Sequence, residues 1–426
     1  MIWVLIAFAA LIIVNVPIAF AIGASGLLFF ILEPNLPTSL ALQRFAEGTQ
    51  SFPLLAVPFF VLAGNLLNET GITKRLINFA NALTGHLVGG LAHISIVLSA
   101  MMGGISGSAN ADAAMQSRIL APQMMGRGYS GGFSTSVIAY SALITATIPP
   151  SIGLILYGFV GEVSIGQLFL AGIVPGVLMT IILMVTSTLI AKKRHYTPAR
   201  VERASFKEVA ATFKASFWGL LFPVILIVGI RFGVFTASEA GAFAVVYAFV
   251  VGAFIYKELD WKTLNKVLKN TVEDNAIIML IIACASILGY VITSARLPQE
   301  ASASLLALTE SPLLITAIVL LFLLLAGMFM ESTVNTLLLT PIFLPIMTNI
   351  GMDPVHFGIL MMTIVTMGGM TPPIGVTMYT VCSLSNVPVT DYMKESLPFI
   401  GAVVVFIVLL VVFPQISLFL PEQLMR

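Results

Sequence analysis

The feature that most constrains this chain is the length of its uncharged, apolar stretches. Only 9% of the 426 residues are charged and 58% are hydrophobic, whereas a water-soluble domain carries about 25% charged residues. No water-soluble fold buries so much apolar surface, so lipid must cover part of it. We therefore predict an all-α polytopic membrane protein, with apolar segments at about 2–15, 17–32, 53–69, 88–104, 109–125, 132–160, 167–191, 217–231, 239–256, 276–293, 313–330, 335–350, 354–386 and 392–413.

The sequence lacks the motifs that mark several classes of function. It has no nucleotide-binding signature and no nucleophile–base pair that the spans would bring together, so we predict that the protein is not an enzyme. The two cysteines, Cys284 and Cys382, have no metal-ligand spacing. The net charge of +1 gives no indication of a polyanionic partner, and we predict no nucleic-acid binding. The N-terminus lacks a basic region and a cleavage site, which favours a retained span.

Four apolar segments are interrupted in ways that a simple membrane helix is not. Segments 132–160 and 354–386 are too long for one helix, and each contains a Pro-Pro pair. Two other pairs of segments, 88–104 with 109–125 and 313–330 with 335–350, are joined by a few small polar residues. These joints lack the charged loop of a water-exposed turn. We interpret them as re-entrant helical hairpins whose tips stop inside the membrane.

The interruptions occur twice, in the same order. Asn110 is followed by Pro149-Pro150, and Asn335 is followed at nearly equal spacing by Pro372-Pro373. A Gly and a Tyr then follow each Pro-Pro pair. We predict two repeats joined by a basic linker: residues 1–191 with hairpin 88–126 and broken helix 130–160, linker 192–214, and residues 215–426 with hairpin 313–350 and broken helix 354–386.

The distribution of positive charge predicts how the chain crosses the membrane. With 192–214 in the cytoplasm, 16 of the 20 Lys and Arg residues fall on the cytoplasmic side, as the positive-inside rule requires. Both termini then lie outside, and the two hairpins open to opposite sides. The repeats therefore have inverted topology, as in many secondary transporters. The Arg residues that fall outside are Arg44, Arg231, Arg296 and Arg426.

Three polar stretches predict amphipathic helices at the membrane surface. They are residues 72–84, 257–271 and 299–310.

The hairpin tips and Pro-Pro breaks are the predicted binding elements. Irregular backbone at membrane depth is tolerated where it lines a site, and it exposes unpaired carbonyl and N–H groups. Hard cations prefer oxygen ligands, so we predict one Na⁺ in each half, held between a tip and its break. The predicted ligands are Ser106, Asn110, Thr145, Ser151 and Gly153 in the first half, and Thr333, Asn335, Thr366, Gly369 and Met370 in the second. The alternative is that these small residues merely allow close helix packing.

Two carboxylates lie beside the tips. Asp112 and Glu331 could compensate a bound cation, pair with tip N–H groups or carry a proton, or each could cap a half-helix. Arg118 is expected to extend to the lipid headgroups.

With these motifs the chain resembles a known family, the large membrane subunit of the tripartite ATP-independent periplasmic (TRAP) transporters. The resemblance covers essentially the whole chain. It rests on the segments VPFFVLAGNLLNETGI (57–72), GGISGSANADAAM (103–115), YSALITATIPPSIGLILYG (140–158), FGVFTASEAGAFAVVYA (232–248), GMFMESTVNTLLLTPIFLPI (327–346) and GGMTPPIGVTMY (368–379).

The resemblance implies an elevator-type, Na⁺-driven uptake of organic acids across the bacterial inner membrane. It implies two partners, a small membrane subunit of about four helices and a soluble periplasmic binding protein. It also implies a periplasmic N-terminus. The overall look is closest to the sialic-acid branch, with two or more Na⁺ ions as coupling ions. On this hypothesis the substrate carboxylate would be held at the tips, by Ser108, Asn110, Asn335 and Thr371.

Two other transport functions fit the same repeats. A stand-alone Na⁺/dicarboxylate symporter would work without a binding protein. In a proton-coupled antiporter, Asp112 and Glu331 would control the pH dependence.

Overall fold

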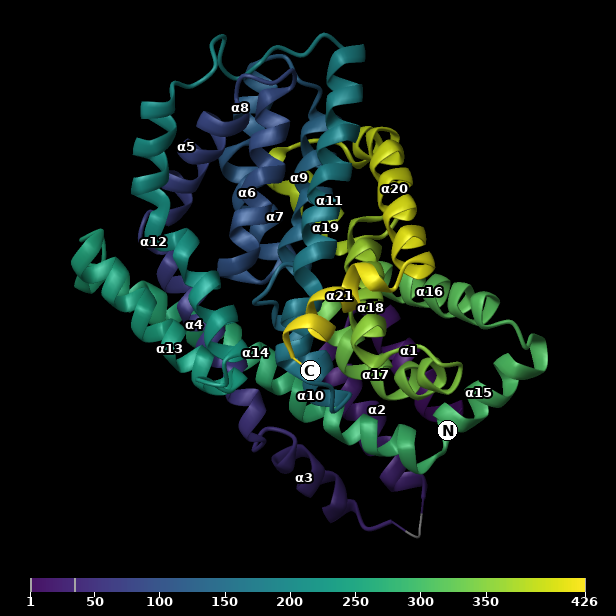
Figure 1. Ribbon diagram of the computed structural model, residues 1–426. Helices are drawn as coiled ribbons and strands as arrows, with labels where there is room; N and C mark the ends of the chain where they lie inside the picture. Colours follow the sequence, from purple (N-terminus) through teal and green to yellow (C-terminus); the bar gives the residue numbers. More distant parts are fainter. Residues whose placement is uncertain (1, 34–35, 426) are drawn as a thin grey trace.

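The protein is all-helical in the computed structural model, which describes residues 2–33 and 36–425 (Figure 1). Seven helices of this part are long and apolar enough to cross a membrane, or up to eight if the bent pair at Pro149-Pro150 counts as one span. The prediction of a polytopic helical membrane protein agrees with this count. Arg426, which the charge distribution predicts on the outside, lies beyond the described residues.

The helices fall into two groups, and the first is peripheral. Within it α4 packs on α13, and α14 packs on α2, α3 and α4. Its members are α1 (Ile2–Ile13), α2 (Ile18–Leu32), α3 (Thr38–Glu47), the 3-10 turn η1 (Phe52–Leu55), α4 (Ala56–Glu69), α5 (Ile72–Thr84), α12 (Phe206–Arg231), α13 (Ala237–Val250), the π-turn η2 (Val251–Ile255) and α14 (Trp261–Ser294).

The second group is central and holds both hairpins and both broken helices. A further helix, α15 (Leu297–Leu308), leads from α14 into it and packs on α17. The members of the central group are α6 (Gly90–Ser106), α7 (Ala109–Ile119), α8 (Ala121–Gly126), α9 (Gly131–Thr147), α10 (Ile152–Val160), α11 (Ile165–Lys193), α16 (Pro312–Phe329), α17 (Ser332–Asn349), α18 (Pro354–Met370), α19 (Val376–Ser385), α20 (Val389–Val412) and α21 (Gln415–Leu424).

Both predicted hairpins have antiparallel arms. Ser95 on α6 donates a hydrogen bond of 2.6 Å to Gln116 on α7, so the chain has turned back on itself between them. In the second hairpin, the rings of Phe322 on α16 and Phe343 on α17 lie 5.2 Å apart. We call residues 106–108 the first tip and residues 330–331 the second tip.

Both long apolar segments break at their Pro-Pro pair. Proline has no N–H and its ring clashes with the preceding turn, so a helix does not continue through two prolines in succession. Helices α9 and α10 meet at an angle of 47°. We call residues 148–151 the first break and residues 371–375 the second break. Both contain a cis Pro–Pro peptide bond.

The first arms of the broken helices, α9 and α18, form the centre of the molecule. Residues 132–147 and 355–370 are all buried. Close approach of α16 to α18 requires glycine, because a Cβ on Gly327 would lie 2.3 Å from the carbonyl oxygen of Val365. The central position of α9 and α18 brings both breaks inside the fold.

Two predicted boundaries were wrong. Residues 257–271 do not form a separate surface helix, since α14 runs without a break from Trp261 to Ser294 and has no proline to end it. The basic linker 192–214 is shorter than predicted. Helix α11 extends to Lys193, and α12 starts after Ser205, whose hydroxyl caps it by accepting from the N–H of Glu208 at 3.2 Å.

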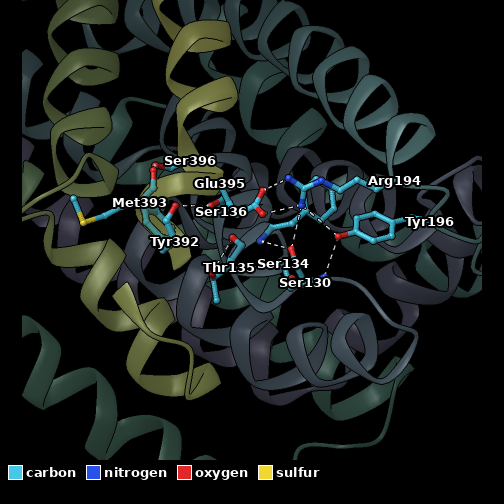
Figure 2. A network of polar contacts seen from close by, with 12 residues as sticks. Ser130, Ser134, Thr135, Ser136, Arg194, Tyr196, Tyr392, Met393, Glu395 and Ser396 are labelled. Atoms are coloured by element: carbon cyan, nitrogen blue, oxygen red, sulfur yellow. Dashed lines mark hydrogen bonds and ion pairs between the residues drawn. The ribbon is translucent and has the colours of Figure 1, made fainter. Parts of the chain in front are cut away.

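The loop after α11 is fastened to the central group (Figure 2). Arg194 donates two hydrogen bonds, of 2.8 and 2.6 Å, to the carboxylate of Glu395 on α20. It also donates to Ser130 at the start of α9, and the ring of Tyr196 stacks on that of Tyr129 at 4.4 Å. The Glu395 carboxylate raises the pKa of the Arg194 guanidinium by stabilising its charged form.

Candidate functional site

The first hairpin contacts its own break, and each hairpin contacts the broken helix of the other half. Helix α7 packs on α19, and α17 packs on α10, an exchange that Figure 1 shows for α7 and α19 near the middle of the molecule. Thr377 on α19 donates a short hydrogen bond to the side-chain oxygen of Asn110 on α7. The candidate site is therefore built from both halves at once.

The first tip is seated on the first break. Gly107 has φ of +59°, a conformation that favours glycine. A Cβ there would lie 2.4 Å from the carbonyl oxygen of Pro150. Ser108 then begins α7, and its hydroxyl accepts from the N–H of Ala111 at 3.4 Å. Ser151 caps α10 in the same way, accepting from Leu154 at 3.5 Å.

Asp112 lies behind the first tip in a closed polar network. Asp112 is 1% exposed, and its carboxylate accepts hydrogen bonds from Ser99 at 2.6 Å, from Gln116 at 3.0 Å and from Thr145 at 2.8 Å. Thr145 therefore belongs to this network. All donors to the carboxylate are neutral, so the network stabilises Asp112 without an ion pair.

The second tip is held by an amide instead of a glycine. Asn335 is fully buried, and its side-chain nitrogen donates to the carbonyl of Met330 at 2.8 Å and to that of Glu331 at 3.3 Å. Its side-chain oxygen has no hydrogen-bond partner. Glu331 accepts a hydrogen bond from Thr333 at 3.2 Å.

The second break leaves carbonyl groups without their helical donors. Pro372 and Pro373 have no N–H, so the carbonyls of Gly368 and Gly369 lose the donors that a continuing helix would supply. The N–H of Thr371 reaches Gly368 at 3.0 Å, and its hydroxyl donates to Met367 at 2.7 Å. The Gly369 carbonyl receives no donor from the two prolines.

Met370 is the next residue, and its carbonyl is doubly capped. The hydroxyls of Tyr140 and Tyr392 donate to it at 3.2 and 2.7 Å. These two bonds use both lone pairs of the carbonyl oxygen, so Met370 has none left for a cation in this arrangement.

Other oxygens around the tips and breaks are buried and have no partner. Buried polar atoms normally form hydrogen bonds, and exceptions call for an explanation. Together with hydroxyl and carbonyl oxygens, they form a donor set that suits a hard cation such as Na⁺. These unpartnered oxygens belong to Ser106, Asn335, Thr363 and Thr366.

A cavity of about 220 Å³ adjoins the first tip. Ser106 and Ser108 line it from the hairpin, and Asn65, Asn68 and Asp274 line it from the peripheral helices α4 and α14. The first tip thus faces a space between the central and peripheral groups that polar and apolar side chains line together.

The predicted ligands do not form two equivalent sets. Ser106, Ser151 and Gly153 lie near the first tip and break, whereas Asn110 reaches across to Thr377. A Cβ on Gly153 would lie 2.0 Å from the Met362 methyl carbon, so this glycine serves close packing of α10. Sequence reasoning missed Thr363, Gln116, Tyr140 and Tyr392. Their signal was weak: Tyr140 and Thr363 lie within uniformly buried helix segments, Gln116 is one of several polar residues in α7, and Tyr392 lies at the start of α20.

No group of three or more His, Cys, Asp and Glu side chains that could hold a metal ion occurs in residues 2–33 and 36–425.

Comparison with known proteins gives a consistent result over nearly the whole chain. A family described as tripartite ATP-independent periplasmic transporter, DctM component, matches residues 5–416. The chain is 38% identical to the sialic acid TRAP transporter large permease protein SiaM of Vibrio cholerae, covering 96% of this chain and 95% of that protein. It is 36% identical to the C4-dicarboxylate TRAP transporter large permease protein DctM of Pseudomonas aeruginosa, covering 95% and 94%.

One solved structure has a similar fold. The crystal structure of the Alcanivorax borkumensis YdaH transporter superimposes with a TM-score of 0.56 over 87% of this chain and 86% of that one, at 14% sequence identity. At this identity the likeness concerns the arrangement of helices alone.

Proposed function

The chain belongs to the family of TRAP transporter large permeases, and from this premise we propose that it performs Na⁺-coupled uptake of an organic acid across the bacterial inner membrane. The family consists of multi-pass membrane permeases and not of enzymes. The observation that carries the proposal is the set of buried, unpartnered oxygens at the tips and breaks. Buried polar atoms normally form hydrogen bonds, and a bound cation would supply the partner that these oxygens lack.

The cation would be bound by side-chain and carbonyl oxygens of both halves. In the second half these are the side-chain oxygens of Asn335 and Thr366 and the carbonyl of Gly369. In the first half Ser106 contributes a free hydroxyl oxygen. Coupling follows if Na⁺ prefers the arrangement of tips and breaks that also binds substrate.

An anionic substrate would be held at the tips. The N-terminal ends of α7 and α17 present unpaired N–H groups and the positive end of the helix dipole, both of which favour a carboxylate. Ser108 and Asn110 lie at the first of these ends, and Asn335 lies at the second. We favour sialic acid because of the similarity to SiaM. The similarity to DctM makes C4-dicarboxylates the second choice.

Two partners complete the proposed transporter, as in the family. One is a small membrane subunit that covers part of the peripheral group, and the other is a periplasmic protein that delivers the substrate. The N-terminus would face the periplasm. The central group would move as a rigid body against the peripheral group, in the manner of an elevator.

Uptake of labelled sialic acid into proteoliposomes tests this function. The vesicles contain this chain and the small subunit, with and without the binding protein, under an inward Na⁺ or K⁺ gradient. We expect uptake only with Na⁺ and the binding protein together. Uptake without the binding protein would instead indicate a stand-alone symporter. Uptake driven equally by K⁺ would contradict Na⁺ coupling, and uptake of C4-dicarboxylates alone would change the substrate.

A further inference from the structure

We propose that Tyr140 and Tyr392 are positioning residues for cation binding: they hold the second break in the shape that leaves the Gly369 carbonyl free for Na⁺. This inference rests on the proposed function. It concerns two side chains that the sequence motifs did not single out as ligands, and it assigns them a role through the backbone of α18.

The two tyrosines come from different parts of the chain and converge on one atom. Tyr140 lies in α9, in the first half, and Tyr392 lies in the first turn of α20. Both are fully buried. Their rings stack 6.5 Å apart, and the ring of Tyr140 stacks at 5.9 Å on that of Phe399. Because the aromatic packing holds the rings in place, the two hydroxyls can fix the position of the Met370 carbonyl.

The second break needs such a fixed point because the prolines remove helical donors. Of the carbonyls at the end of α18, that of Gly368 is satisfied by the Thr371 N–H at 3.0 Å. That of Met370 is satisfied by the tyrosines. The carbonyls on either side of Gly369 therefore have hydrogen-bond donors. The Gly369 carbonyl is the acceptor that the two prolines leave without its helical donor.

The carbonyl oxygen of Gly369 faces Gly375 at the end of the second break, where a Cβ would lie 2.4 Å from it. A Cβ on Gly369 would lie 3.4 Å from the Thr377 hydroxyl and 3.8 Å from the Gly327 carbonyl. Gly327 is next to Ala326, whose carbonyl is 3.4 Å from the Asn335 side-chain nitrogen. The second break, the second tip and Thr377 thus meet in one region, and a shift of the Met370 carbonyl would be transmitted to it.

The first break has no equivalent anchor. Thr147 occupies the position of Met370, two residues before the Pro-Pro pair. Its carbonyl faces Gly172 of α11, where a Cβ would lie 2.2 Å from the oxygen. The first break is therefore held by backbone contact, whereas the second depends on two hydroxyl groups.

Thermal unfolding of the full chain in detergent micelles tests the inference. The melting temperature is measured as NaCl replaces choline chloride at constant ionic strength, which gives the Na⁺ concentration for half-maximal stabilisation. The variants Tyr392→Phe and Tyr140→Phe keep the rings and remove the hydroxyls. We expect each to raise this concentration by roughly three- to tenfold, with the larger effect for Tyr392 because its bond is shorter.

Tyr157→Phe is the matched control. Tyr157 is also fully buried, and its hydroxyl donates at 2.7 Å to a carbonyl, that of Pro354, which is at the start of α18 and far along the helix from the break. Its removal should lower the melting temperature in both salts alike and change the half-maximal Na⁺ concentration by less than about twofold.

Three outcomes would overturn the inference. An equal Na⁺ shift in Tyr157→Phe would reduce the effect to general loss of packing. An unchanged or lower Na⁺ requirement in both Tyr140→Phe and Tyr392→Phe, with the unaltered chain still stabilised by Na⁺, would contradict the positioning role but leave the proposed function standing. Absence of Na⁺ stabilisation in the unaltered chain would contradict both. If Tyr392→Phe does not fold, Tyr140→Phe carries the test.

Discussion

The first hairpin tip turns on Gly107 and lies against the backbone of its own break, whereas the second tip has no residue with positive φ and is held by the Asn335 side chain. The carboxylates beside the two tips also differ in the number of side-chain hydrogen bonds that they accept. Asp112 accepts hydrogen bonds from three side chains, and Glu331 accepts one from Thr333. The first tip is thus closed by many contacts, and the second by few.

The two breaks differ in exposure as well. Pro149, Pro150 and Ser151 are all buried, whereas Pro373 and Ile374 are exposed, Ile374 by 39%. Three of the four unpartnered oxygens near the tips and breaks also belong to the second half. Matched sequence motifs can therefore have different roles in the structure. We infer that the first tip and break are held by more contacts, and that the second tip and break have more oxygens free for a ligand.

The largest expected difference between the halves concerns the two asparagines. Asn335→Ala removes a free oxygen and the side-chain donor to the Met330 carbonyl, so Na⁺-driven uptake should fall by about tenfold or more. Asn110→Ala removes one bond to Thr377 and should reduce uptake by only about two- to fivefold. Proteoliposome uptake measures both, with membrane insertion as the control. A greater loss for Asn110→Ala would reverse the assignment of roles.

The second comparison concerns stability and the two carboxylates. Asp112→Ala removes the acceptor that three buried donors share, although Gln116 and Thr145 keep their bonds to Ser99, and it should lower the free energy of unfolding by about 2–3 kcal/mol. Glu331→Ala should cost less than about 1 kcal/mol. Chemical denaturation in detergent, followed by tryptophan fluorescence, compares them. Asp112→Asn, which keeps the shape and an acceptor oxygen, should lie between the two, and equal costs for both alanine variants would count against a closed first site.

A third prediction isolates the contact between the first tip and its break. Gly107→Ala and Gly128→Ala both place a side chain at positive φ, +59° and +83°, which costs about 1–2 kcal/mol. Only Gly107 faces an obstacle, because a Cβ on Gly128 would meet nothing within 4 Å. Gly107→Ala should therefore have the lower melting temperature. Equal melting temperatures would mean that the first tip is not seated on Pro150.

The smallest effect is expected at the surface, where Arg194 joins the loop between the halves to α20. Arg194→Ala should lower the free energy of unfolding by about 1 kcal/mol or less, and 1 M KCl should make this difference smaller. Arg200→Ala breaks a pair with Glu208 that forms within one segment, and it should cost less still. Thermal unfolding at low and high KCl measures both. A larger cost for Arg200→Ala would show that Arg194 does not fasten the halves together.

Much of the helical architecture could be predicted from local signals. The bounds of α16 and α17 agree with the predicted segments to within about three residues, and α18 and α19 together cover the predicted broken helix 354–386, because prolines and uncharged runs mark them. The prediction failed at α14, where a polar first part and an apolar second part continue as one helix. Polarity changes along that segment, but nothing in its first part breaks the backbone.

The candidate site was predicted less completely. Asn335 and Thr366 have the free oxygens expected of cation ligands, while Thr145 lies in the Asp112 network and the Met370 carbonyl is capped by tyrosines. The predicted pairing of each tip with its own break holds for the contact between Gly107 and Pro150. It omits the exchange in which α7 packs on α19 and α17 packs on α10.

The sequence alone determined that the chain is helical, that lipid covers it and that its backbone breaks at the two Pro-Pro pairs. Those properties follow from side-chain polarity and from the missing proline N–H, which act within a few residues. Only the tertiary structure decided which groups satisfy the carbonyls that the breaks expose. Tyr140 and Met370 are separated by 230 residues, and the packing of several helices at once brings them together.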